Sequence, residues 1–471
     1  MRTLSIRSFV VLVAILSLCA VSYAQTGSSS VRGTVRDPQG NLVSGATVTI
    51  TDVERNFSRT QTTSEDGTYV FSSLTPSTYT LQVEAAGFKR LSVTDVKALV
   101  DTALTQDVAL EVGAVTETVN VTSGNDAPLN TNDASIGNTF ESRRIEELPL
   151  NARNIVGLLS LQPGVTRLGE VNGGRRDQAN ITLDGVDVNE QQTGLDPVNG
   201  STTVTPGDAF ASVLRVTPDS VQEFRVTTSA PNADQGRSSG AQVSLVTKSG
   251  TNDFHGSAFW YHRNTATTAN DFFNNAAGSF VATDAAVIAG TAAVGDPRVP
   301  RPKLLRNIFG GSLGGPVVKD RFFFFYSYEG RRDAAEQSVL RFVPTASLRQ
   351  GNVIYRTTTG ALATLTPAQI AAAYPALGGV NPSGLSVLQT APLPNDFSIG
   401  DGLNRAGFRF NAPIKNEFET HSARLDFILT DRQTMFFRGN YQDDLYQQAP
   451  AFPGTPSPAL WYHPKGFVGG H

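Results

Sequence analysis

Two short glycine–serine patterns are the places where this sequence could support nucleophilic catalysis. Gly310–Gly314 and Gly236–Gly240 both read Gly-x-Ser-x-Gly, which is the pattern of a nucleophile elbow. An elbow serine is activated between a buried parallel strand and a helix. Neither pattern is followed by helical periodicity. We therefore expect no catalysis from Ser312 or Ser238, and an exported hydrolase is the weakest of three hypotheses.

The residue types that bind metals do not occur at ligand spacing. Asp184 and Asp187 could begin a calcium loop, but the further oxygen ligands are missing, so both are predicted to be turn residues. Arg175 and Arg176 are predicted to form structural ion pairs. The sequence thus predicts no catalytic, metal or cofactor site. The histidines, which lack i, i+4 pairing and partner cysteines, are His255, His262, His421, His463 and His471.

The N-terminus has the pattern of a secretory signal. Residues 1–24 contain two arginines, an apolar run over Phe9–Ala20 and a small-x-small cleavage site that ends at Ala24, so the mature chain would begin at Gln25. The apolar run is too short to span a bilayer. The only cysteine, Cys19, lies inside this signal. Its position excludes disulfides and thiolate chemistry from the mature part of these 471 residues.

The remaining composition points to strands and to the bacterial envelope. Only 17% of residues are charged and the net charge is −4, which argues against nucleic-acid binding. No later run of 18 apolar residues exists, so membrane insertion would require β-strands. In Val221–Asn264 three runs alternate apolar and polar residues. The last of them, Gly256–Tyr261, has aromatics on both faces, so we expect one face to meet lipid and the other the protein interior.

Residues 28–112 form the first predicted unit, with about seven short strands separated by Gly- and Asp-containing turns. Val31–Ile50, Asp66–Phe71 and Tyr79–Phe88 resemble the carboxypeptidase regulatory-like domain. This resemblance implies a prealbumin-like β-sandwich, a fold that is often grouped with carbohydrate-binding folds. A spacer or docking role and sugar binding both remain open, although the unit lacks tryptophan.

Residues 113–138 are predicted to be a polar linker. A β-prone run within it resembles the TonB box of TonB-dependent receptors, which pairs as an added strand with a partner protein. The resemblance implies a TonB-type energy-transducing protein as the partner. The candidate box is Val115, Thr116, Glu117, Thr118, Val119, Asn120 and Val121.

Residues 139–250 are predicted to be a mixed α/β unit. The pattern predicts helices over Glu141–Leu148 and Arg153–Leu161, and a hairpin turn at Asp184-Gly185. Asn151–Val165, Gly173–Val188 and Pro218–Phe259 resemble the plug domain of TonB-dependent outer-membrane receptors, and more narrowly of the Oar-like group. The structural motif positions carried by this resemblance are Arg153, Asn154, Pro163, Gly164, Arg175, Asp184 and Gly185.

Residues 251–471 resemble the first part of an Oar-like transmembrane β-barrel, on the evidence of Leu305–Pro316 and Lys319–Gly330. His421–Leu429 and Thr434–Gln442 predict an apolar-out, polar-in hairpin with a tight turn at Asp431-Arg432. Pro344–Lys415 is predicted to be an extracellular loop. Six to eight strands are expected where the family has 22, so we expect the N-terminal part of a longer receptor, and no functional pore if these residues were complete.

The fold class predicted is mainly β: a prealbumin-like sandwich, a mixed α/β plug and a partial antiparallel transmembrane β-barrel. The favoured function is an outer-membrane TonB-dependent receptor that takes up a substrate by plug displacement. The alternative is a surface carbohydrate-binding or adhesion protein anchored by the barrel. The expected surroundings are outer-membrane lipid, with no nucleic acid. The substrate is open among siderophore, oligosaccharide, peptide and protein, and no cofactor is expected.

Overall fold

The computed structural model describes most of the chain after the predicted signal. The predicted cleavage site at Ala24 and Gln25, most of the predicted helix Arg153–Leu161, and the motif residues Asn154 and Arg175 lie outside the described residues. Among the described residues, no helix is long and apolar enough to cross a membrane. The described ranges are 27, 29–123, 135–147, 153, 155, 158, 161–166, 170–174, 178–189, 214–231, 235–269, 302–431, 433–463 and 465–470.

The first unit is a β-sandwich, called the sandwich below. One sheet has the order β4-β1-β7, with β8 also paired to β1, and the other has the order β3-β2-β5-β6-β9. Apolar residues alternate along the strands, and their inward side chains form one core between the sheets. The strands are β1 Ser29–Arg36, β2 Thr47–Asp52, β3 Ser58–Thr62, β4 Thr68–Leu74, β5 Ser77–Glu84, β6 Arg90–Ala98, β7 Ala103–Thr105, β8 Val108–Ala109 and β9 Thr118–Thr122.

The second unit, called the central domain, is a five-stranded sheet in the order β10-β13-β14-β11-β12. β11 and β14 run parallel, while the other pairs are antiparallel. Its core is separate from that of the sandwich and includes the stacked rings of Phe140 and Phe224 at 4.6 Å. The elements are β10 Ile136–Glu141, α2 Ser142–Glu147, β11 Asn180–Leu183, β12 Val186–Asp187, η3 Pro218–Ser220, β13 Val221–Ser229 and β14 Gln242–Thr247.

The third unit, called the long sheet, is antiparallel in the order β15-β16-β17-β21-β22-β23, with β20 paired to β21 and β24 to β22. The mainly β fold class is thereby confirmed. Short turns join β16 to β17 and β21 to β22, at one end of the sheet. The elements are β15 His255–Asn264, η4 Thr265–Thr267, β16 Leu304–Val318, β17 Phe322–Pro344, β20 Asp396–Gly400, β21 Arg405–Thr430, β22 Gln433–Gln447, β23 Ala459–Tyr462 and β24 Lys465–Gly470.

The two faces of the long sheet differ, as the alternation predicted. On β17, Phe323 and Phe325 are buried while Tyr326, on the opposite face, is 41% exposed. On β15, Trp260 is 70% exposed, whereas the rings of Phe259 and Tyr261 lie under a guanidinium of the central domain. This face of Gly256–Tyr261 therefore contacts the central domain, although Tyr261 is still 51% exposed.

The predicted loop Pro344–Lys415 begins where β17 ends, at Pro344, but its C-terminal bound is wrong because β21 already starts at Arg405. β17 and β21 stay paired as far as Pro344 and Arg405, because small or aromatic residues recur at every second position from 406 to 412. Residues 345–404 fold into a small unit, called the tip module, stabilised by caps such as the capping box at Thr366. Besides β20, it contains α5 Ala346–Arg349, β18 Val353–Arg356, β19 Leu362–Leu365, α6 Pro367–Ala373, η5 Pro375–Leu377 and α7 Pro382–Thr390.

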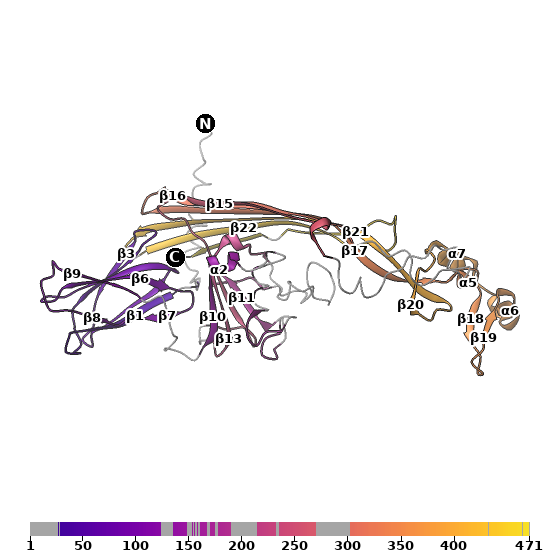
Figure 1. Ribbon diagram of the computed structural model, residues 1–471, viewed down its shortest axis with the longest axis horizontal. Helices are drawn as coiled ribbons and strands as arrows, with labels where there is room; N and C mark the ends of the chain where they lie inside the picture. The colour runs from indigo at the N-terminus through magenta and orange to yellow at the C-terminus, as the bar shows by residue number, and fades with distance from the viewer. Residues whose placement is uncertain are drawn as a thin grey trace, which may run out of the picture.

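Figure 1 shows how the units are arranged. The long sheet extends along the molecule, and the central domain lies against one of its faces. The sandwich lies at the end of the long sheet that carries the short turns, and the tip module lies at the opposite end (Figure 1). The inner face of the long sheet is therefore the surface that meets the central domain.

Candidate functional site

The contact between the central domain and the long sheet is built around a single carboxylate, Asp184. Asp184 and Gly185 have φ angles of 48° and 79°, which suit a two-residue hairpin turn between β11 and β12. The turn projects the side chain of Asp184 toward β14. There its carboxylate accepts hydrogen bonds from the backbone N–H of Thr247, at 2.9 Å, and from the Thr247 hydroxyl, at 2.8 Å. The sequence prediction of a turn residue is confirmed, but it misses this second role.

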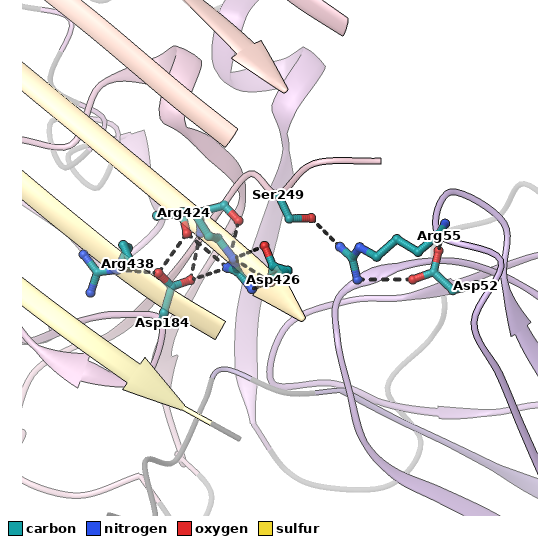
Figure 2. A network of polar contacts seen from close by, with 8 residues as sticks. Asp52, Arg55, Asp184, Ser249, Arg424, Asp426 and Arg438 are labelled. Carbon is teal, nitrogen blue, oxygen red and sulfur yellow. Dashed lines mark hydrogen bonds and ion pairs between the residues drawn. The ribbon is translucent and has the colours of Figure 1, made fainter. Parts of the chain in front are cut away.

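Two arginines of the long sheet hold the same carboxylate. Nη1 of Arg424 lies 3.2 Å from one Asp184 oxygen, and Nε of Arg438 lies 2.7 Å from the other. Arg424 also pairs with Asp426 at 2.9 Å, and Arg438 donates to the carbonyl of Leu183 at 3.0 Å. Figure 2 shows Asp184 between the two guanidiniums. At most 6% of the Arg424, Arg438 and Asp184 side chains is exposed, so water contributes little to this cluster.

In a second contact the arginine belongs to the central domain and an acidic partner belongs to the long sheet. The guanidinium of Arg153 pairs with Asp219 at 2.5 Å and with Glu329 of β17 at 2.9 Å. It also lies over the rings of Phe259 and Tyr261, at 4.5 and 4.8 Å from their centroids. Arg153 has a φ of 52°, a region that few non-glycine residues occupy. The backbone is therefore held in an unusual conformation by the contacts of this side chain.

A third contact of the same kind involves Arg215. Its guanidinium pairs with Asp444 of β22 at 2.7 Å and lies 4.4 Å from the ring centroid of Phe418. The backbone carbonyl of Arg215 accepts from Gln442 at 3.1 Å. Arg215, like Arg424 and Arg438, was not singled out by the sequence. The available signal was the polar face of Ser422–Asp426 and Arg438–Gln442, which must oppose complementary charge if it faces the interior.

These three contacts place buried charges at the interface, while the central domain keeps an apolar core of its own. A buried ion pair adds little net stability compared with an apolar contact, but removing one partner is costly. If water enters, it can solvate both partners. The geometry therefore suits two bodies that fit in one arrangement and can separate while the core of the central domain stays intact. No bond-making chemistry is implied by these groups.

The candidate TonB box occupies the edge of the sandwich. Thr118–Thr122 forms β9 and pairs in parallel with Arg90–Thr94 of β6. Lys89 fixes the start of this strand through ion pairs with Glu117 at 3.2 Å and Glu111 at 3.5 Å. Val119 packs partly against the core, while Val115 and Val121 are 36% and 44% exposed. Its other edge is unpaired among the described strands.

The other predicted positions have structural roles where they are described. Gly164, beside Pro163, has a φ of 80°, and its carbonyl accepts from Asn172. Ser312 lies within β16 and contacts the Ser257 hydroxyl at 2.9 Å. Ser238 donates to two backbone carbonyls in the central domain. Both serines of the nucleophile-elbow patterns are therefore used in local hydrogen bonding.

Comparison with known families identifies two of the three units. Residues 246–467 match the outer membrane beta barrel domain. Residues 30–111 match the carboxypeptidase regulatory-like domain. The two matches cover the long sheet and the sandwich, and they agree with the resemblances stated for the sequence.

Among curated proteins, the TonB-dependent transporter Oar of Myxococcus xanthus is 26% identical over 325 residues, which are 66% of this chain and 27% of that protein. The chain thus spans about a quarter of the length of this relative. The outer membrane transporter YddB of Escherichia coli shares 14% identity over 71% of this chain and 52% of its own, with a TM-score of 0.30. Catechol 1,2-dioxygenase of Acinetobacter radioresistens shares 16% identity over 21% of this chain and 58% of its own, with a TM-score of 0.16.

Both TM-scores are too low to support an inference, so the identification rests on sequence. The carboxypeptidase regulatory-like match precedes the barrel match along the chain, and the similarity to Oar extends over 325 residues. The chain therefore contains an outer membrane beta barrel domain and a carboxypeptidase regulatory-like domain, and its similarity to Oar supports an Oar-like TonB-dependent receptor located in the outer membrane.

Proposed function

We propose that this receptor takes up a substrate across the outer membrane, with the central domain acting as the plug. In this proposal the central domain closes the lumen beside the long sheet, and a TonB-type energy-transducing protein displaces it. The observation that carries the proposal is the buried polar interface, in which Asp184, Arg153 and Arg215 each meet an opposite charge on the long sheet. The chain spans only 27% of the length of its relative. Its activity, partner and substrate are therefore all part of this proposal.

The chemistry of the interface supports a plug that moves. An apolar interface of this kind would be as durable as a domain core, whereas buried ion pairs hold one register and can be replaced by hydrated charges. Asp184, with its contacts to Thr247, Arg424 and Arg438, is called the Asp184 hub below. Thr247 is the last residue of β14 and is followed by the connection to β15. A displacement of the central domain would therefore break the contacts of Asp184 with Arg424 and Arg438.

The edge position of β9 supports the assignment of the partner-binding segment. A partner strand can add to Thr118–Thr122 through its free backbone groups, or can capture the whole segment after it separates from β6. Only Val119 packs against the sandwich core, so little apolar area is lost when the strand leaves. The substrate stays open, with oligosaccharide and siderophore among the classes that a receptor of this group could take.

The test is a pull-down of the receptor with the C-terminal domain of TonB from the same organism. We expect binding by the intact chain and loss of binding when Val115–Val121 is deleted. The matched control replaces Ser58–Thr62, the strand at the opposite edge of the same sheet, with a scrambled sequence and should leave binding intact. Unchanged binding after the deletion would show that the partner uses another segment.

A further inference from the structure

The sandwich contacts the central domain through the loop that follows β6. The N–H of Val100 donates to the carboxylate of Glu223 on β13. Arg225, two residues further along β13, donates to the Thr102 hydroxyl at 2.6 Å. Asp101 accepts from Gln235 at 3.2 Å. Three consecutive residues of one loop are therefore bound by the central domain.

Val100 shows that this contact is a closed interface. Its side chain is fully buried, although it belongs to neither of the two hydrophobic cores. A Cβ placed on Gly27 would lie 3.1 Å from a methyl of Val100 and 3.3 Å from a methyl of Val246, the latter on β14. Val246 is also buried outside both cores. Gly27 therefore lies against one buried valine from each domain at this contact.

A second contact lies at the turn between β2 and β3. Arg55 pairs with Asp52 and donates to the Ser249 hydroxyl, as Figure 2 shows. The carbonyl of Glu54 accepts from the N–H of Asn252 at 3.0 Å. Ser249 and Asn252 belong to the connection that leads from β14 to β15. The sandwich therefore holds the segment through which the central domain joins the long sheet.

Both contacts hold segments that adjoin the Asp184 hub, at its contacts with Thr247 and Arg424. One holds β13, which pairs with β14. The other holds Ser249, two residues after the Thr247 that binds Asp184. While both contacts persist, neither β13 nor the β14–β15 connection is free to shift away from Arg424.

The order of the elements determines which part feels a pull on the candidate box. β9 is hydrogen-bonded to β6, and β6 leads directly into the Val100 loop. The central domain begins only at β10, with Ile136. Tension applied at Val115–Val121 therefore reaches the sandwich before it reaches the central domain.

We propose that the sandwich, while it is docked at both contacts, prevents displacement of the central domain. The sandwich must then detach before the central domain can move, and this restraint is called the brake below. The proposal rests on the proposed function only in that the central domain moves. It assigns a role to a domain that would otherwise be a spacer. The partner then acts in two steps, first on the sandwich and next on the central domain.

The experiment pulls on the full receptor and locks the sandwich in place. A tag inserted at Ala114 serves as the handle for optical tweezers, so the result does not depend on TonB binding. Asp101→Cys with Gln235→Cys is bridged by a short cleavable bismaleimide, which ties the two domains. The matched control, Thr49→Cys with Thr60→Cys, bridges two strands within the sandwich whose hydroxyls lie 3.0 Å apart.

We expect the sandwich to detach before the central domain is displaced. The interdomain bridge should slow displacement of the central domain at fixed force by at least about tenfold, because the docking bonds can no longer open. Cleaving the bridge should restore the rate, and the control bridge should leave it unchanged. Equal rates with and without the interdomain bridge would overturn the brake.

A second variant keeps the proposal testable if the bridged receptor assembles poorly. Val100→Asp places a charge in the interface and spares the sandwich core, to which Val100 does not belong. We expect faster hydrogen exchange in Val221–Ser229 and unchanged exchange in β2 and β5; unchanged exchange in β13 would contradict the brake. If the bridge blocks displacement but TonB fails to bind, the proposed partner is wrong and the brake stands.

Discussion

Arg424 of the long sheet and Asp184 of the central domain are 240 positions apart in the chain, and they form a buried ion pair of 3.2 Å. Arg438 approaches the same carboxylate from the next strand at 2.7 Å. One carboxylate therefore faces two cations of the long sheet, and Asp426 balances part of the charge of Arg424.

Asp184→Asn should loosen the central domain. Asparagine tolerates the positive φ of the turn, so the hairpin should persist, but Arg424 and Arg438 lose their shared anion. Breaking a buried pair by removing one partner costs about 3–5 kcal/mol. We expect a loss of this order in the free energy of releasing the central domain, measured by urea titration with hydrogen exchange in Val221–Ser229.

Asp187→Asn is the matched control for that substitution. Asp187 lies on the same hairpin and pairs with Arg237, whose side chain is 65% exposed. Exposed pairs contribute about 0–1 kcal/mol, so this variant should change the release free energy only slightly. Similar losses in the two variants would show that the hairpin, rather than the buried charge, holds the central domain.

Arg153 and Glu329 should show a large coupling energy. Their 2.9 Å contact joins the central domain to β17 with 12% and 6% of the side chains exposed. A double-mutant cycle with Arg153→Met and Glu329→Gln should give about 1–3 kcal/mol in urea unfolding. The reference pair is Arg143 and Glu147 on α2, 89% and 65% exposed, for which about 0.3–0.5 kcal/mol is expected. Equal coupling energies for the two pairs would argue that Arg153 and Glu329 do not form a buried contact between the central domain and β17.

Docking of the sandwich should weaken as the pH rises. Burial raises the pKa of Glu223 from 4.5 to about 8, and Glu141 of β10 and Asp101 of the sandwich add to the rise, whereas the Val100 N–H and Arg225 oppose it. A detached sandwich exposes Glu223 and returns its pKa toward 4.5, so the docked state binds the proton more tightly. Protonation of Glu223 contributes fully to docking below pH 4.5, and this contribution is lost by pH 8. Between these values the docking constant falls by up to about tenfold per pH unit.

Hydrogen exchange of the peptide that contains Val100, measured between pH 5 and 9 with correction for intrinsic exchange, reports this docking. Glu223→Gln keeps an acceptor for the Val100 N–H and removes the titration. The variant should dock independently of pH and more tightly than the wild type above pH 8. A wild-type docking constant that is flat over this window would rule out Glu223 as the controlling group.

An arginine on the outer face of the long sheet should impair assembly according to its depth. Leu425 and Leu429 lie on the same face of β21, 38% and 56% exposed, and Leu429 is close to the turn at Asp431. Leu425→Arg should cost about 2–4 kcal/mol and Leu429→Arg about 0–1 kcal/mol. The fraction of heat-modifiable, folded receptor in outer membranes measures the difference. Equal fractions for the two variants would contradict the lipid-facing assignment.

Local patterns were sufficient to predict most of the elements. The alternation around Tyr79–Val83 and the Asp184-Gly185 turn produce the expected strand and hairpin, since side-chain period and turn chemistry are properties of neighbouring residues. The short hairpin of β21 and β22 also has its polar residues on the inner face, with Arg424 and Arg438 buried there.

The contacts between units could not be predicted from local sequence patterns. The pairing of Asp184 with Arg424 joins residues 240 positions apart, and no local period encodes such a distance. The segment at Thr118–Thr122, predicted to be linker, pairs with β6 because that sheet edge is open to it. The full length of β21 was missed because Gly and Pro residues near Arg405 suggested that the loop continued to Lys415.

The tip module has a consequence for the kinetics of folding. β17 contains 23 residues and β21 contains 26, and their first contact must close a loop of about 60 residues, an entropic cost that grows with loop length. The module closes this loop by itself: Thr345 donates to the carbonyl of Asn404 at 2.9 Å, and the Asn404 side chain bonds both backbone groups of Ile354. Once it has folded, each further pair of the hairpin forms between residues that are already adjacent. A contact that is remote in sequence then forms at the rate of a local one, and pairing proceeds from the tip toward the short turns.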